Sequence, residues 1–146
     1  MKANAGKVGS QSVYARMSAL LGVALRSEAD AVKVVTKGLS AKSYRHLAKK
    51  LGFEAKLIAP ESTVRRRLEN DSRFTQCESE RLLRLARIFA EATELFGDET
   101  RAKTWVKTPA NYLPDLGPVT PLEVCSTEPG ARLIEGHLLR TAHGIF

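Results

Sequence analysis

The last third of the chain carries local signals that confine it to short helices joined by sharp corners. Pro109 ends any helix that runs through Trp105, because proline cannot extend a preceding helix and disfavours the helical conformation of the residue before it. Thr120–Glu123, with the sequence TPLE, combines a capping hydroxyl, a proline at the first helical position and a glutamate at the third. This capping box predicts the start of a short helix.

Apolar residues at three- and four-residue spacing predict helices through most of the chain. A second capping box, Thr75 with Glu78, opens the longest predicted helix, over Gln76–Phe96, and Gly97 ends it. The apolar, β-branched residues 29–37 leave strand and helix open. Further helices are predicted over residues 12–26, 41–51, 62–70, 99–106 and 130–142, the last of them capped by Ser126 or Thr127 and ended by Gly144. The fold class is therefore predicted to be all-α.

Positive charge is concentrated in the N-terminal half. Met1–Arg73 contains 15 Lys and Arg against 6 Asp and Glu, whereas Phe74–Phe146 contains 8 against 10. Such an asymmetry suggests that one half meets a polyanion, most often nucleic acid, and that the other half meets a different partner. We predict a disordered N-terminus over residues 1–11, a helical DNA-binding region over 12–74, and a bridging helix with a second helical domain over 75–146.

The triple arginine Arg65-Arg66-Arg67 is the strongest nucleic-acid feature. With Val64 and Leu68 facing inward, the arginines are predicted to project outward, where guanidinium groups bind phosphate or the edge of guanine. A basic helix that follows a short helix across a tight turn has the layout of a helix-turn-helix. The alternative is a basic surface that is simply solvated. The candidate DNA-binding residues are Ser62, Thr63, Arg65, Arg66, Arg67, Lys49, Lys50 and Arg73.

No catalytic, cofactor or metal site is predicted. Cys77 and Cys125 are far apart and do not lie among histidines at ligand spacing, so neither a disulfide nor a zinc site is indicated. No nucleophile, base and orienting group occur together, and the glutamates of the long helix, Glu91 among them, are interpreted as a solvated face. No stretch approaches the roughly 18 apolar residues that span a bilayer. We therefore expect a cytoplasmic protein that is not an enzyme and has no membrane partner.

The order of landmarks in the C-terminal third resembles the toxin-binding domain of the Xre/MbcA/ParS antitoxin family, partners of RES-domain toxins. Upstream, the segment from Thr63 to Arg67 is similar to the recognition-helix region of the family's Xre-like helix-turn-helix. The resemblance implies an Xre-like bundle joined by a long helix to a small toxin-binding domain. The C-terminal landmarks are Phe96-Gly97-Asp98, Trp105 with Pro109, Thr120-Pro121-Leu122, Thr127 with Gly130-Ala131, and Gly144.

The same resemblance implies the antitoxin of a RES-Xre type II toxin–antitoxin system. Such a protein would sterically inhibit an NAD⁺-degrading RES toxin with its C-terminal helix and tail, bind operator DNA to repress its own operon, and form a homodimer within the complex. For Trp105 and Leu122, a place in the domain's own core is an equal alternative. The candidate toxin-binding residues are Trp105, Leu116, Pro118, Leu122, Arg132, Glu135, Leu139, Arg140, His143, Gly144, Ile145 and Phe146.

Two other functions fit parts of the sequence. A stand-alone helix-turn-helix transcriptional regulator would use its C-terminal half only to dimerise. An RNA-binding helical module would share the basic charge, but few aromatic residues accompany the N-terminal cations, and base stacking requires them.

Overall fold

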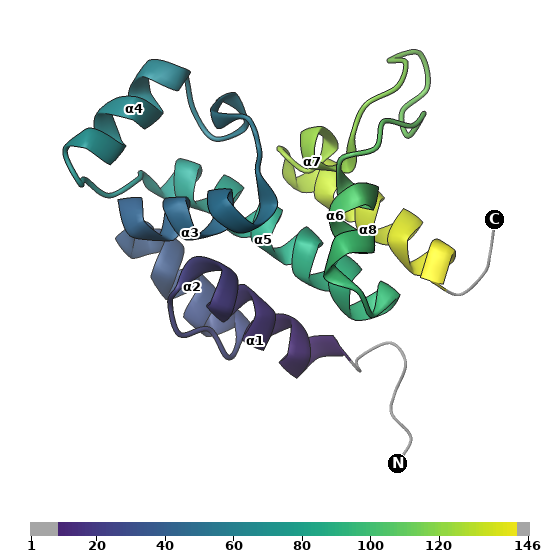
Figure 1. Cartoon of the computed structure of the whole chain (residues 1–146), viewed down its shortest axis with the longest axis horizontal. Helices are drawn as coiled ribbons and strands as arrows, with labels where there is room; N and C mark the ends of the chain where they lie inside the picture. Colours follow the sequence, from purple (N-terminus) through teal and green to yellow (C-terminus); the bar gives the residue numbers. More distant parts are fainter. Residues whose placement is uncertain (1–8, 143–146) are drawn as a thin grey trace.

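The computed structural model describes residues 9–142, and the regular elements in that range are helical (Figure 1). The predicted all-α fold class is confirmed. The elements are α1 (Gly9–Leu21), α2 (Glu28–Lys37), α3 (Ala41–Leu51), the short 3₁₀ helix η1 (Ala55–Leu57), α4 (Glu61–Glu69), α5 (Gln76–Phe96), α6 (Glu99–Val106), α7 (Pro121–Val124) and α8 (Glu128–Ala142).

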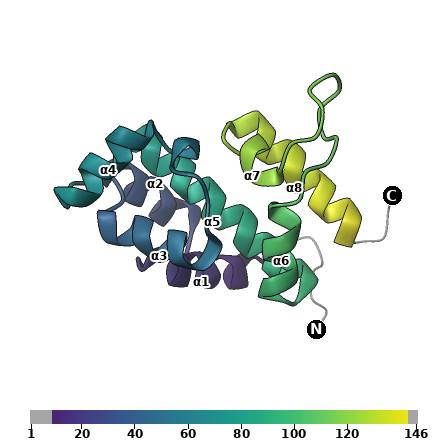
Figure 2. The ribbon, with the colours of Figure 1, turned by 45° about the horizontal axis from the view of Figure 1, so that its top comes forward.

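The long helix α5 is the element against which most other helices pack (Figure 2). It contacts α1, α2 and α3 from the N-terminal half, and α6 and α8 from the C-terminal half. Its apolar face contributes Leu82 and Phe89 to a hydrophobic core that also contains Met17 of α1, Leu47 of α3 and Ile134 of α8. Each fully buried side chain of this size contributes roughly 1.5–3 kcal/mol to stability. The two halves of the chain therefore share one continuous core.

The predicted helix ends in the second half are confirmed in detail. In both capping boxes, at Thr75 and Thr120, the threonine hydroxyl accepts from the backbone N–H three residues on, and the glutamate there accepts from the threonine N–H. Gly97 ends α5 in the left-handed conformation, and Asp98 caps α6. Thr127 is the cap of α8, because its hydroxyl accepts from the N–H of Gly130. Gly144 lies outside the described residues.

Two predictions for the N-terminal region were wrong. Residues 9–11, predicted to be disordered, form the first turn of α1. That helix ends at Leu21 rather than near Arg26, because Gly22 takes a positive φ of 66° and the chain turns there. Leu25, which follows this turn, is still buried. The Ser18 hydroxyl holds its backbone beside α1, because it accepts from the Leu25 N–H and donates to the Leu25 carbonyl oxygen, both at 2.9 Å. Residues 29–37, left open between strand and helix, belong to α2, which Ser27 caps.

Gly38 marks the tightest backbone crossing in the N-terminal half. Its φ is 94°, and a Cβ placed there would lie 2.4 Å from the carbonyl oxygen of Phe74. The extended segment before α5 passes directly against it, with the Phe74 N–H donating to the Leu39 carbonyl at 2.9 Å. Only glycine fits both the conformation and the space. Among residues 9–142, no helix has the length and apolar character needed to cross a membrane.

Candidate functional site

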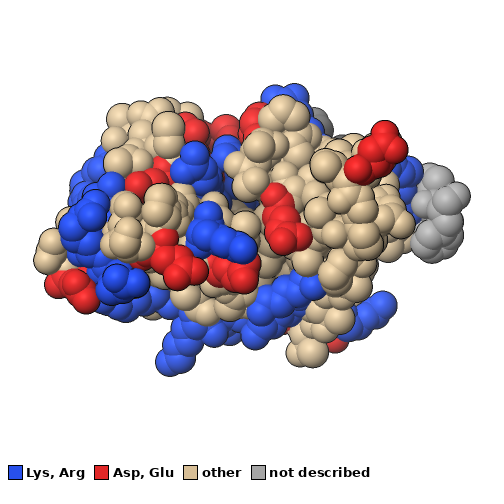
Figure 3. Space-filling model, turned by 90° about the horizontal axis from the view of Figure 1, so that it is seen from above, with Lys and Arg blue, Asp and Glu red and all other residues tan. Residues whose placement is uncertain are grey.

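One end of the molecule presents basic side chains around α4. Lys and Arg gather at the left of Figure 3, the end at which α4 lies. Val64 anchors α4 in the core, so the next two residues, Arg65 and Arg66, point away from it and are exposed or nearly so. Ser62 is exposed and Thr63 is half-buried in the first turn of the same helix. These four predicted DNA-binding residues therefore occupy one short helix.

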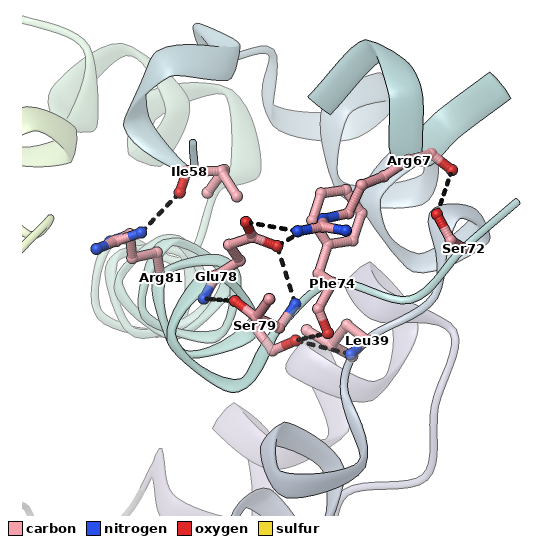
Figure 4. A network of polar contacts seen from close by, with 9 residues as sticks. Leu39, Ile58, Arg67, Ser72, Phe74, Glu78, Ser79 and Arg81 are labelled. Atoms are coloured by element: carbon pink, nitrogen blue, oxygen red, sulfur yellow. Dashed lines mark hydrogen bonds and ion pairs between the residues drawn. The ribbon is translucent and has the colours of Figure 1, made fainter. Parts of the chain in front are cut away.

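Arg67 does not project outward as predicted. Its guanidinium group donates two hydrogen bonds, of 2.8 and 3.1 Å, to the carboxylate of Glu78 (Figure 4). Glu78 also closes the capping box of α5, accepting from the Thr75 N–H at 2.9 Å. Burial alone would raise the pKa of Glu78, but the hydrogen bonds from Arg67 and Thr75 outweigh it and hold that pKa below its ordinary value. Arg67 therefore fastens α4 to the start of α5.

Of the other predicted DNA-binding cations, Arg73 is bound within the fold, whereas Lys49 and Lys50 lie at the surface. Arg73 donates to the carbonyl oxygen of Gly38 at 2.7 Å and so bridges the loop before α5 to the end of α2. Lys50 lies 3.4 Å from Glu99 in an exposed ion pair, which contributes little to stability. Lys49 is exposed on α3. Arg45 of α3 donates a hydrogen bond of 2.9 Å to the carbonyl oxygen of Leu68 near the end of α4. The sequence did not predict this link between the two helices.

Two of the predicted toxin-binding residues lie largely within the fold. Leu122 is buried in α7, and Trp105 is half-buried with its ring edge-on to Phe96 at a centroid distance of 6.0 Å. Core packing, the alternative that the sequence left open, explains both placements. Glu135 is half-buried on α8.

The remaining described candidates lie at the surface. Arg132, Leu139 and Arg140 are exposed on α8, and Leu116 and Pro118 are exposed in the loop between α6 and α7. The last four candidates, His143, Gly144, Ile145 and Phe146, lie outside the described residues.

An acidic pair lies at the seam between α5 and α8. Glu91 of α5 faces Glu135 of α8, and one carboxyl oxygen of Glu91, Oε1, is buried without a hydrogen-bond partner. Burial, and then the neighbouring Glu135 carboxylate, raise the pKa of Glu91 to about 8. The thiol of Cys125 nearby is buried too, and its pKa rises to about 12. The interpretation of Glu91 as part of a solvated helix face was therefore wrong.

A groove of about 540 Å³ runs between α2, α5 and α8. Four of its charged side chains form two ion pairs, Arg87 with Glu28 at 2.9 Å and Arg132 with Glu128 at 3.0 Å. Within residues 9–142, no group of three or more His, Cys, Asp or Glu side chains is arranged to hold a metal ion.

Comparison with known proteins matches the C-terminal part of this structure to a family. The model of the family described as "Antitoxin Xre/MbcA/ParS C-terminal toxin-binding domain" matches residues 91–144, which include most of the seam with α8 and the loop that carries Leu116. A protein named "Antitoxin Xre" from Pseudomonas putida strain KT2440 is 32% identical over 140 residues, covering 93% of this chain and 86% of that protein.

Two further relatives with the same name match shorter stretches. "Antitoxin Xre" of Yersinia enterocolitica is 39% identical over 88 residues, 60% of this chain and 57% of that protein. "Antitoxin Xre" of Photorhabdus laumondii is 38% identical over 81 residues, 55% of this chain and 53% of that protein. The similarity to the Pseudomonas protein extends through both halves of the fold. The chain is therefore an antitoxin of the Xre/MbcA/ParS family, a regulatory protein and not an enzyme.

Proposed function

We propose that this antitoxin neutralises a RES-domain toxin by covering its NAD⁺ pocket with α8 and the residues that follow it. The observation that carries this proposal is the match of residues 91–144 to a toxin-binding domain, because that stretch contains α8 and reaches Gly144. In α8, Ile134 and Leu138 are buried in the core while Leu139 and Arg140 are exposed, so the helix has one face for its own fold and another for a partner. The apolar end Ile145-Phe146 suits a hydrophobic pocket.

Deleting residues 144–146 is expected to weaken binding to the purified RES-domain toxin encoded beside this gene by at least about tenfold, because the anchor that fills the pocket is gone. The midpoint of thermal unfolding should stay unchanged, since Ile134 and Leu138 still hold α8 in the core. Isothermal titration calorimetry measures the affinity, and circular dichroism measures the unfolding. Undiminished affinity of the truncated chain would rule out the pocket-blocking tail.

The basic end would bind operator DNA through α4, which follows the short helix η1 across residues 58–60 in the order of a helix-turn-helix. Arg65 and Arg66 point away from the core, as base or phosphate contacts require, and Lys49, Ser62 and Thr63 would add phosphate contacts. Arg67 and Arg73 are assigned to the fold because each holds a partner within it. We further propose that the protein acts as a cytoplasmic homodimer within the complex. Its DNA-binding region would span residues 12–74 and its bridging helix and toxin-binding domain residues 75–146.

Replacing both Arg65 and Arg66 by alanine is expected to weaken operator binding by at least about tenfold. The slope of the logarithm of the binding constant against the logarithm of the salt concentration should become shallower by about one for each phosphate that the variant no longer neutralises. Binding should be measured by fluorescence anisotropy at several salt concentrations, with DNA from the gene's own promoter. Arg101→Ala with Lys103→Ala, which removes two charges from α6, is the matched control and should retain full affinity. Equal affinity of the Arg65/Arg66 variant and the control would place the DNA-binding surface elsewhere.

A further inference from the structure

A projecting loop between α6 and α7 is unlike the other connections of the fold. Residues 110–119, here called the arm, extend away from the helices in both ribbon views (Figures 1 and 2). At its base, Ala110 and Val119 exchange two backbone hydrogen bonds of 3.0 Å and form an isolated antiparallel bridge. Beside this bridge, the ring of Tyr112 packs edge-on against His137 of α8 at a centroid distance of 5.1 Å. The arm is thus fixed to α8 at its base.

The tip of the arm has a constrained backbone. The Leu116 N–H donates to the Leu113 carbonyl at 3.4 Å, with Pro114 second in the turn and Asp115 third at a φ of 66°. Proline followed by a residue of positive φ is the arrangement of a type II turn. Pro118 comes two residues after the leucine, and each proline fixes its own φ and restricts the residue before it. The backbone on both sides of Leu116 is therefore restricted, at Pro114 and at Pro118, before any partner binds.

This constrained tip presents one large apolar side chain to solvent. Leu116 is 64% exposed, more than any other large hydrophobic residue within residues 11–141. Its neighbours Tyr112, Leu113 and Val119 are half-buried against the core, so the arm turns its other apolar side chains inward and leaves this one out. A single exposed leucine is common at protein surfaces and does not by itself mark a binding site. Leu116 gains its interest from its place at the tip of a loop that lies within residues 91–144, the matched domain.

We propose that the arm is a preformed docking element of the toxin interface, and that Leu116 at its tip enters a hydrophobic pocket on the toxin. The partner follows from position: the arm lies within residues 91–144, which match the toxin-binding domain, and its base is packed on α8. This inference rests on the proposed function for the identity of the partner. It adds a second anchor, separate from the C-terminal tail. The arm would lose its conformational entropy when the antitoxin folds, so that binding the toxin costs less.

The test compares single substitutions for affinity to the purified RES-domain toxin. Leu116→Ala is expected to raise the dissociation constant about 30-fold, as for a central apolar anchor, and Leu116→Asp to raise it further. Ala19→Asp is the control, because Ala19 is exposed on α1, outside both the toxin-binding domain and the groove beside α8. It should bind within about twofold of the wild type. Because both residues are exposed, neither change should lower the unfolding temperature appreciably.

A second variant tests whether the arm is preformed. Replacing Pro114 and Pro118 by glycine keeps Leu116 but frees the backbone, and should weaken toxin binding about 3- to 10-fold. Wild-type affinity of Leu116→Asp would overturn the proposal, as would a Leu116→Asp defect in self-association, measured by light scattering, without any defect in toxin binding. Failure of the wild-type chain itself to bind the toxin would instead refute the proposed function, and with it this inference.

Discussion

Replacing Glu91 by glutamine is expected to stabilise the antitoxin, and the gain should grow as the pH rises. The pKa of Glu91 lies at about 8 in the folded chain, against an ordinary value of 4.5. Between pH 4.5 and 8, the folded state therefore keeps a proton on Glu91 that the unfolded state has lost. The contribution of this proton to stability is therefore fully present below pH 4.5 and is lost as the pH rises from 4.5 through 8. Glutamine, which stays neutral, removes this loss, so the gain in stability is on the order of a few kcal/mol near pH 8 and close to zero below pH 4.5.

The groups around Glu91 account for the direction of this effect. Burial is the largest cause, Glu135 of α8 opposes a second negative charge, and Arg87 on the same helix only partly compensates because it also pairs with Glu28 of α2. Thermal unfolding measured at about pH 5, 7 and 8 should show the unfolding temperature of Glu91→Gln rising above that of the wild type by on the order of 10 °C at the highest pH. Glu80→Gln, on the same helix, is the control. A difference between wild type and Glu91→Gln that did not grow with pH would refute the assignment.

Replacing Gly130 by alanine is expected to destabilise the toxin-binding end, although alanine is the better helix former. A Cβ at this position of α8 would lie 1.8 Å from the carbonyl oxygen of Val124 and 2.9 Å from the hydroxyl of Thr127 that caps the helix. Alanine gains about 1 kcal/mol in helix propensity, but displacing a backbone carbonyl and the cap costs about 3 kcal/mol or more. The clash therefore dominates, and the net loss is about 2 kcal/mol, or roughly 4–8 °C in unfolding temperature.

Gly136 in the same helix offers a matched comparison. A Cβ there would meet only the end of the Arg140 side chain, at 3.5 Å, which is ordinary contact. Gly136→Ala should therefore raise the free energy of unfolding by up to about 1 kcal/mol, and with it the unfolding temperature slightly. Gly130→Ala should lower both. If both alanines stabilised the protein, the close packing of α7 against the start of α8 would be wrong. In toxin-binding assays, Gly130→Ala should reduce affinity in parallel, while operator binding is preserved.

Several features set by residues close in sequence were predicted correctly. The capping boxes at Thr75 and Thr120, the helix over residues 41–51 and the end of the long helix at Gly97 each depend on a few neighbouring residues, and the structure confirms them. The fold class followed from the same local periodicity. The choice of helix for α2 also depended on a local signal, the Ser27 side chain that accepts from the N–H of Asp30, which the sequence interpretation had overlooked.

Features set by packing between distant segments were not predicted. Arg67 looked identical to Arg65 and Arg66 in the sequence, and only the start of α5, which brings Glu78 to it, distinguishes the three. Glu91 looked like any glutamate on a long amphipathic helix, but it is half-buried, with its Oε1 atom fully buried, because α8 packs against that part of α5. Periodicity tells which face of a helix is apolar, but it does not tell which helix will lie against the flank of that face.

The most direct test of the proposed neutralisation is a measurement of cellular NAD⁺. A RES-domain protein encoded beside this gene, which the proposal requires, should be expressed with either the full-length antitoxin or the chain lacking residues 144–146. Cellular NAD⁺ and growth should then be followed after induction. We expect normal NAD⁺ and growth with the full-length chain, and NAD⁺ depletion with the truncated chain at equal protein levels. NAD⁺ depletion with both chains would contradict the antitoxin–RES pairing and favour a stand-alone transcriptional regulator, whereas protection by both would contradict the pocket-blocking tail.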